Sequence, residues 1–229
     1  MQWKITGTEG FATLDFILNV EDVVRAQPRS MVLMGTGIEI SAAVGGDLNS
    51  GGILSGIKGM LAGESFASAT FKSKRNAERL SLAPDTIGPI LPIDLAINQD
   101  LLIAKGAYLA CEPSITLKTQ YGGVKSLLAK KGLYLLRATG PGHVFLTGAG
   151  EIREFSLEKD ERVAIDNDYV VAFESTVQYS VVTAAKGLKD SILSGEGIIN
   201  RYTGPGIVYY QTRSKLKPGM LSTIINTTT

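Results

Sequence analysis

The 229-residue sequence is poor in the side chains that most often carry catalysis, with one cysteine, Cys111, and one histidine, His143. A single cysteine excludes an internal disulfide, which fits a reducing compartment. A single histidine cannot build a zinc site or a facial triad without unusual help from carboxylates. A Ser-His-Asp triad would also need His143, and no nucleophile-elbow motif accompanies it. We therefore expect no enzyme activity, no cofactor and no metal, with Cys111 structural and His143 beside a turn.

Charge imbalance and long apolar runs are also missing. The 23 lysines and arginines are balanced by 22 aspartates and glutamates, so no net field attracts a phosphate backbone or an anionic membrane. No run of about 18 apolar residues could span a bilayer. The first residues, Met1 to Lys4, lack the charged-then-apolar pattern of a secretory signal. We expect a soluble, cytoplasmic protein without stable membrane insertion, and peripheral membrane contact stays open.

A short phrase occurs twice, as Thr-Gly-Pro-Gly at 139–142 and again at 203–206. Proline presets φ at the second position of a turn, and glycine supplies the positive φ that a type II turn needs at the third. Each copy therefore predicts a tight β-turn between two strands. The 26 glycines of the chain are typical of a β-rich protein with many such turns.

Period-two alternation predicts the strands themselves. The clearest example is 169–182, where apolar and polar residues alternate as in a half-buried antiparallel strand, with a hairpin bent near Ser175 as the alternative. Two shorter strands at 150–157 and 162–165 precede it, and we expect the three to form one meander. A similar arrangement occurs at 88–117 and, more faintly, at 10–40. The chain therefore holds three related meanders.

Each meander leads into a similar connector, at 57–64, 124–131 and 188–196, where the apolar spacing predicts one or two helical turns. Another strand follows each connector. The period is about 65 residues, and three periods nearly exhaust the chain. This pattern predicts an all-β fold of three pseudo-symmetric repeats, each an antiparallel β-sandwich or short double-stranded β-helix.

The repeats are expected to form one compact unit because each is too small for a core of its own. Their expected extents are about 1–64, 65–131 and 132–219, with 220–229 as a flexible tail. We also expect the last strand, at 207–211, to pair near Trp3 and so close a ring.

The first connector is glycine-rich and carries an apolar stripe. A phosphate-loop interpretation fails here, because three residues instead of four separate Gly52 from Gly56, and Gly59 instead of a hydroxyl residue follows Lys58. Two interpretations stay open: the stripe covers one end of a sandwich, or it docks on another subunit or a membrane surface. The stripe consists of Ile53, Leu54, Ile57, Met60 and Leu61.

The later connectors carry lysines that would contact an anion if they lie on one rim. These are Lys125, Lys130, Lys131 and Lys189. The leading hypothesis is a non-enzymatic scaffold or protein-interaction protein that self-associates, through exposed sheet edges or the apolar connector, into a homo-oligomer. The alternative is a binding module for a small anionic ligand or nucleic acid, although the balanced charge argues against nucleic acid as a partner.

The run from Gly187 to Gly197, followed by Thr203 to Arg213, resembles the C-terminal signature of a family related to the altered-inheritance-of-mitochondria protein 24. Residues 45–65 are similar to that family's first connector, and the resemblance covers essentially the whole chain. It implies a fold like that of the tryptophan RNA-binding attenuator protein. It implies no catalytic residues, and without an Arg-rich presequence it implies no mitochondrial location here.

Overall fold

The computed structural model describes residues 1–8, 10–44, 67–104, 106–121, 134–183 and 198–214. These residues form nineteen β-strands and no helix, so the all-β prediction is confirmed. The helical turns expected in the connectors, and the expected tail at 220–229, lie outside the described residues. The strands are β1 (Gln2–Thr6), β2 (Thr13–Leu18), β3 (Val23–Ala26), β4 (Met31–Met34), β5 (Ile38–Val44), β6 (Ala67–Ser73), β7 (Glu78–Leu82), β8 (Ile90–Leu95), β9 (Asp100–Ala104), β10 (Tyr108–Cys111), β11 (Thr116–Tyr121), β12 (Tyr134–Thr139), β13 (Gly142–Thr147), β14 (Ile152–Leu157), β15 (Arg162–Asp166), β16 (Val170–Glu174), β17 (Gln178–Thr183), β18 (Ile198–Thr203) and β19 (Gly206–Gln211).

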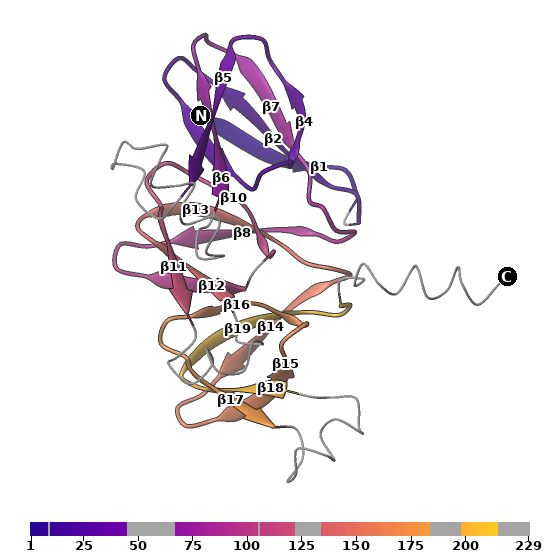
Figure 1. Ribbon diagram of the computed structural model, residues 1–229, viewed down its shortest axis with the longest axis vertical. Coiled ribbons are helices and arrows are strands. Elements are labelled where there is room, and N and C mark those ends of the chain that lie inside the picture. The colour runs from indigo at the N-terminus through magenta and orange to yellow at the C-terminus, as the bar shows by residue number, and fades with distance from the viewer. Residues whose placement is uncertain (9, 45–66, 105, 122–133, 184–197, 215–229) are drawn as a thin grey trace, which may run out of the picture.

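Four antiparallel sheets follow one another along the long axis of the molecule (Figure 1). Sheet 1 has the strand order β1-β2-β7-β4, and sheet 2 the order β5-β6-β3-β10-β13-β8. Sheet 3 has the order β11-β12-β9-β16-β19-β14, and sheet 4 the order β15-β18-β17. Consecutive strands mostly belong to different sheets, so the chain moves back and forth between two layers as it advances.

The same pairing pattern occurs three times. We name the strands at 13–82, 90–147 and 152–211 block 1, block 2 and block 3. The triplet β2-β7-β4 of block 1 has counterparts in β8-β13-β10 and β14-β19-β16, and β5-β6-β3 has counterparts in β11-β12-β9 and β17-β18-β15. In each block a register irregularity falls at the same place of the third strand, in β4, β10 and β16. The blocks join where β3 pairs with β10 and where β9 pairs with β16.

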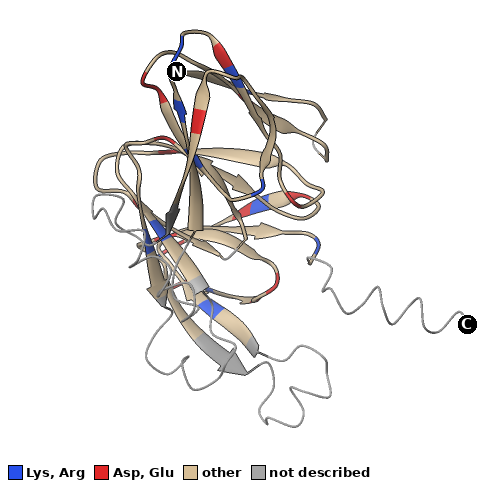
Figure 2. Ribbon diagram, turned by 45° about the horizontal axis from the view of Figure 1, so that its top comes forward, with Lys and Arg blue, Asp and Glu red and all other residues tan. Residues whose placement is uncertain are grey.

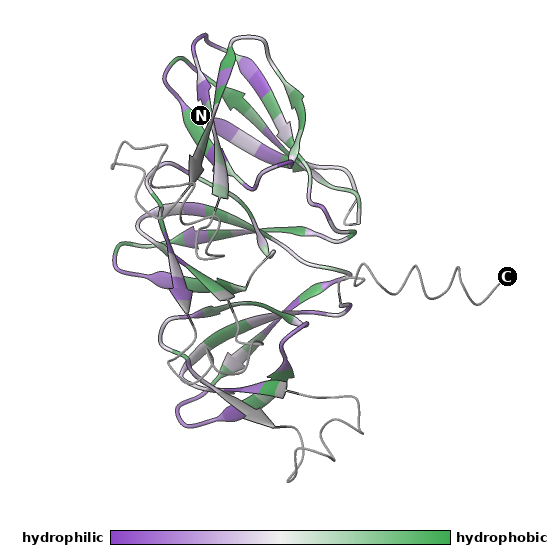
Figure 3. Ribbon diagram, viewed as in Figure 1, coloured by the Kyte–Doolittle hydropathy of each residue, from purple (hydrophilic) through white to green (hydrophobic). Residues whose placement is uncertain are grey.

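Each block has its own hydrophobic core, between its halves of two successive sheets. A strand inside the stack serves two cores with alternate side chains. On β9, Leu101 and Ile103 belong to the block 2 core, whereas Leu102 and Ala104 belong to the block 3 core. A strand buried on both faces tends to be apolar throughout, as Leu101 to Ala104 of β9 are. Figure 3 shows such apolar segments in green along the strands of the stack.

The expected meander is wrong. Strands β14, β15 and β16 do not pair with each other: β14 pairs with β19, β15 with β18, and β16 with β19 and β9. The segment 169–182 is likewise two strands, β16 and β17, which lie in different sheets. Alternation in a sequence shows which faces of a strand are buried, but it does not identify the neighbouring strand.

The expected ring closure is also wrong. Strand β1 pairs with β2 inside sheet 1, where Trp3 lies opposite Phe16, and β19 pairs with β14 and β16. Figure 1 places β1 in the upper sheet and β19 in the lower half of the stack. Trp3 packs against the block 1 core, so the first strand is held by its sequence neighbour instead of by the last strand.

The two Thr-Gly-Pro-Gly phrases connect β12 to β13 and β18 to β19. In each case the two strands belong to different sheets, so the turn carries the chain across the sandwich. Gly142 has φ of 130° and Gly206 has φ of 138°, a conformation that disfavours any side chain. A Cβ on Gly142 would also lie 2.6 Å from Ser114 Oγ and 2.7 Å from Glu112 Oε2, so glycine is required there.

Candidate interaction surface

The apolar stripe and the lysines singled out in the connectors all lie outside the described residues, so both interpretations of them stay predictions. The stripe comprises Ile53, Leu54, Ile57, Met60 and Leu61, and the lysines are Lys125, Lys130, Lys131 and Lys189. Some of the basic residues that the structure does describe face carboxylates. Lys74 Nζ lies 3.2 Å from Glu39, and Arg137 Nη1 lies 2.7 Å from Asp100. Figure 2 shows acidic and basic positions interspersed along the molecule.

The rare side chains His143 and Cys111 sit close together in block 2. His143 lies at the start of β13, with Nδ1 3.3 Å from Glu112 Oε1 but outside hydrogen-bonding alignment, and its ring meets the Trp3 ring at 5.0 Å between centroids. Cys111 is fully buried in β10, and this burial raises the pKa of its thiol. A buried, protonated thiol is a poor nucleophile.

The described residues form neither a metal site nor a membrane-spanning helix. No three His, Cys, Asp or Glu side chains in this part of the chain are arranged to hold a metal ion. This part of the chain also contains no helix of the length and apolarity needed to cross a membrane. The features that do distinguish parts of the surface are the open edges of the sheets.

Two of the sheet edges carry features that discourage pairing with another strand. Strand β8 has Pro92 within it and Pro89 just before it, and proline has no N–H to donate.

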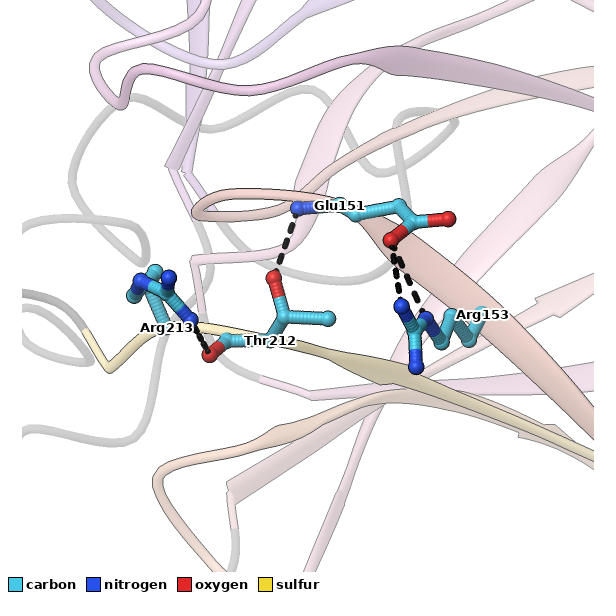
Figure 4. Close-up of polar contacts among 4 residues, drawn as sticks. All are labelled: Glu151, Arg153, Thr212 and Arg213. Carbon is cyan, nitrogen blue, oxygen red and sulfur yellow. Dashed lines mark hydrogen bonds and ion pairs between the residues drawn. The ribbon is translucent and has the colours of Figure 1, made fainter.

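Strand β14 carries an ion pair at its start (Figure 4). Arg153 Nε and Nη2 donate to Glu151 Oε2 at 3.0 and 2.9 Å. These hydrogen bonds raise the pKa of the Arg153 guanidinium. The backbone N–H of Glu151 donates to Thr212 Oγ1 at 2.9 Å, which ties the charged corner to the end of β19.

The outer edge of sheet 1 is formed by β4, and it carries neither proline nor charge. Met31, Val32 and Leu33 are 40%, 61% and 50% exposed. We call these three residues the β4 surface. Exposed apolar side chains in a row on a strand edge are a typical feature of an interaction site.

The counterparts of β4 in the other blocks are completely buried. Leu109 and Ala110 of β10 and Val171 and Ala172 of β16 are all 0% exposed. They hold the places of Val32 and Leu33, because Tyr108/Ala110, Val170/Ala172 and Met31/Leu33 bracket the same register irregularity. The three strands therefore share the pairing within their own block, and they differ in that β10 and β16 also pair with a strand of the preceding block.

The surroundings of β10 and β16 differ from those of β4 because the preceding block contacts β10 and β16. Leu109 and Ala110 lie in the block 1 core, and Val171 and Ala172 lie in the block 2 core, so each pair fills the core of the block before its own. Block 1 is the first of the three blocks among the described residues, and its Val32 and Leu33 are exposed. Met34, by contrast, packs against the core of its own block.

The opposite end of the stack is formed by β15, at the edge of sheet 4. Val163 and Ile165 are half-buried against the block 3 core, and Ala164 between them is exposed. The counterparts of β15 are β3 and β9, which pair with β10 and β16 of the following block. Within the described residues β15 pairs with β18 only.

Sequence reasoning did not single out the β4 surface. The available signal was the run Met31-Val32-Leu33-Met34, which is as apolar as Tyr108 to Cys111 or Val170 to Phe173. Such a run is typical of a strand buried on both faces. In the described structure this run instead forms an edge strand, with Met31, Val32 and Leu33 exposed.

These features define a layered antiparallel β-protein with open strands at its two ends. The chain belongs to the family described as mitochondrial biogenesis AIM24, whose model matches residues 3–213, so the family resemblance is confirmed. It is 29% identical over 216 residues to an uncharacterised protein of Streptococcus pyogenes serotype M6, covering 93% of this chain and 86% of that protein.

The chain is also similar to a solved crystal structure of a Streptococcus pyogenes protein, with a TM-score of 0.75 and 25% identity. The match covers 100% of this chain and 99% of that one. It supports the layered fold over the full length. The likeness to the tryptophan RNA-binding attenuator protein stays a prediction.

Proposed function

We propose that this protein is a non-enzymatic scaffold that self-associates, and that the β4 surface is where a second copy docks. The observation that carries the proposal is the exposure of Val32 and Leu33, at 61% and 50%, in places whose counterparts are fully buried. Fully burying a side chain of this size contributes about 1.5–3 kcal/mol, so covering both half-exposed chains stabilises a contact by a few kcal/mol. A newly paired strand edge adds backbone hydrogen bonds to that contact.

The same proposal includes an internal repeat. The recurring strand order and the register irregularity in β4, β10 and β16 support three six-strand units at 13–82, 90–147 and 152–211, each closing a small sandwich around its own core. In stacked repeats each unit contacts only its neighbours, and a terminal unit needs a polar cap to stay soluble alone. Among the described residues no polar cap covers the β4 surface. A single buried thiol and balanced charge support a cytoplasmic location for the scaffold.

The test is the solution mass of the full chain, measured by light scattering over a range of concentrations. The wild type is expected to associate, and Val32→Lys to be monomeric, because a lysine there would place an ammonium group against an apolar core. Ile97→Lys is the matched control, since Ile97 is 74% exposed in the turn between β8 and β9, away from β4. A wild type that is monomeric at every concentration, or a Val32→Lys variant with the wild-type mass, would overturn the proposal.

A further inference from the structure

We infer that the second copy docks on the β4 surface through its β15 strand, so that copies join head to tail and continue the stack. This inference rests on the proposed self-association and adds the identity of the partner strand. Its basis is the way in which the blocks of one chain already join. Strand β3, or the strand equivalent to it, pairs with β10, or the strand equivalent to it, in the following block.

Two junctions inside the chain have this form. Strand β3 of block 1 pairs with β10 of block 2, and β9 of block 2 pairs with β16 of block 3. Each junction merges three strands of one block with three strands of the next into a six-stranded sheet. The remaining strands of these two positions are β4 and β15. Sheets 1 and 4, which contain them, have four and three strands, so both are incomplete compared with the sheets in the middle.

The two incomplete sheets lie at opposite ends of the molecule. Figure 1 places β4 in the uppermost sheet and β15 in the lowest part of the stack, with sheets 2 and 3 between them. One chain therefore cannot pair its own β4 with its own β15. Two chains can, and the product is a seven-stranded sheet, in which β1 is added to the six-strand arrangement that the chain already contains twice.

The internal junctions also give the register. At the second junction Ala172 lies opposite Ile103, and Phe173 lies opposite Leu102. The counterparts of Ala172 and Phe173 on β4 are Leu33 and Met34. The alignment of β9 with β15 follows from their partner strands β12 and β18, which end at the equivalent residues Thr139 and Thr203. Ile103 pairs with Leu136, three residues before Thr139, and Ile165 pairs with Asn200, three residues before Thr203.

Leu33 of one copy is therefore expected to lie opposite Ile165 of the other, and Met34 opposite Ala164. Ile165 already packs against the block 3 core, so Leu33 would extend that core, as Ala172 extends the block 2 core. Ala164 points away from Ile165 because neighbouring residues of a strand face opposite sides. It would reach the block 1 core of the second copy, as Leu102 reaches the block 3 core.

The side chains at both edges suit this pairing. The centre of β15, Val163 to Ile165, is uncharged, and its charged residues, Arg162 and Asp166, stand at the two ends of the strand. The alternative edges β8 and β14 carry the prolines and the ion pair described above. A contact between two different surfaces is heterologous, and it builds a filament if the rotation between copies does not close and a ring if it does.

Mixing two blocked variants tests the inference. Val32→Lys blocks β4 and leaves β15 intact, whereas Ala164→Lys blocks β15 and leaves β4 intact. Head-to-tail pairing predicts that each variant alone is monomeric, and that an equimolar mixture gives a one-to-one dimer that grows no further. Ala164 is exposed, so its replacement should leave the fold intact, and circular dichroism of each variant checks this.

The outcomes separate this inference from the proposed function. If Val32→Lys is monomeric and Ala164→Lys has the wild-type mass, self-association through β4 holds but the partner strand is not β15. If neither substitution changes the wild-type mass, both proposals fail. If both variants are monomeric but the mixture does not form a dimer, the two edges do not meet and head-to-tail pairing is overturned.

Cysteine pairing tests the register independently. Directly opposite residues of antiparallel strands have Cα atoms about 4.5–5.5 Å apart, a distance that a disulfide spans. A mixture of Leu33→Cys and Ile165→Cys should give a covalent dimer on mild oxidation, whereas either variant alone should not. The native thiol of Cys111 is 0% exposed and should not interfere. Leu33→Cys with Ala164→Cys is the control, because a shift of one residue puts the two thiols on opposite faces. Covalent dimers from Leu33→Cys alone would indicate a symmetric β4–β4 contact and overturn the inference.

Discussion

Strand β4 and its counterparts β10 and β16 have the same pairing within their own block, the same bulge and a similarly apolar sequence, yet they differ completely in exposure. Ala110 and Ala172 are 0% exposed and Leu33 is 50% exposed. The difference arises outside the strand, from whether a preceding block supplies a core and a neighbouring strand. Burial of these strands therefore depends on the junction between blocks. Strand β4, at the end of the stack, has the apolar composition of a junction strand but lacks the partner strand of a junction.

The largest expected effect comes from placing the same charge in the two environments. Leu109→Lys should destabilise the folded chain by at least about 4 kcal/mol, because it buries an unpaired ammonium in the block 1 core. Val32→Lys, at the corresponding place on β4, should change the free energy of unfolding of the monomer by less than about 0.5 kcal/mol. Urea denaturation of both variants at low protein concentration measures the contrast. Similar losses in the two would mean that β4 is already covered within one chain.

Arginines sharpen the same comparison between a junction and an edge. Arg25 of β3 is 9% exposed and donates to the backbone carbonyl oxygens of Pro113, at 2.7 Å, and Ile115 across the first junction. Arg25→Met should cost about 2–3 kcal/mol, since it leaves buried carbonyl groups without donors. Arg153→Met is the control on the exposed edge of β14, where the ion pair with Glu151 is solvated and thermal unfolding should barely shift. A smaller loss from Arg25→Met than from Arg153→Met would contradict the role of the junction.

Alkaline pH should also act on the junction. Burial raises the pKa of Tyr108 well above its ordinary value, and the phenol donates to the Arg25 carbonyl at 2.9 Å. Below about pH 10 the Tyr108 phenol keeps its proton in both the folded and the unfolded chain, so its contribution to stability is fully present there. At higher pH the unfolded chain releases it and the folded chain does not, so this group lowers the free energy of unfolding by up to about 1.4 kcal/mol per pH unit.

Tyr108→Phe should therefore make the loss of stability between about pH 10 and 11 less steep, although it costs about 1 kcal/mol at pH 7 through the lost hydrogen bond. Guanidinium denaturation at a series of pH values measures both quantities. An unchanged slope would mean that Tyr108 ionises as readily in the folded chain as in the unfolded one.

How much the sequence could predict follows the same division between a strand and its surroundings. Strand positions such as 150–157 and 162–165 were found correctly because period two depends on the strand alone. The pairing of β15 with β18 puts Arg162 opposite Thr203, 41 residues later in the chain; such a pairing leaves no local mark, and the expected meander is wrong for that reason. Leu101-Leu102-Ile103-Ala104 and Met31-Val32-Leu33-Met34 are equally apolar, but only the pairing pattern shows that the first is shared by two cores and the second has one core and an open side.

The smallest expected effect is that of salt on self-association. The β4 surface is uncharged, and the charges of β15 stand at its ends, so screening has little to weaken. The apparent dissociation constant should change less than about threefold between 0.05 and 0.5 M sodium chloride, whereas sodium sulfate should strengthen association because it favours apolar burial. Sedimentation velocity across the two salt series measures this. Association that falls steeply with sodium chloride would instead favour an anionic partner bound by the connector lysines, because that contact depends on charge and the β4 contact does not.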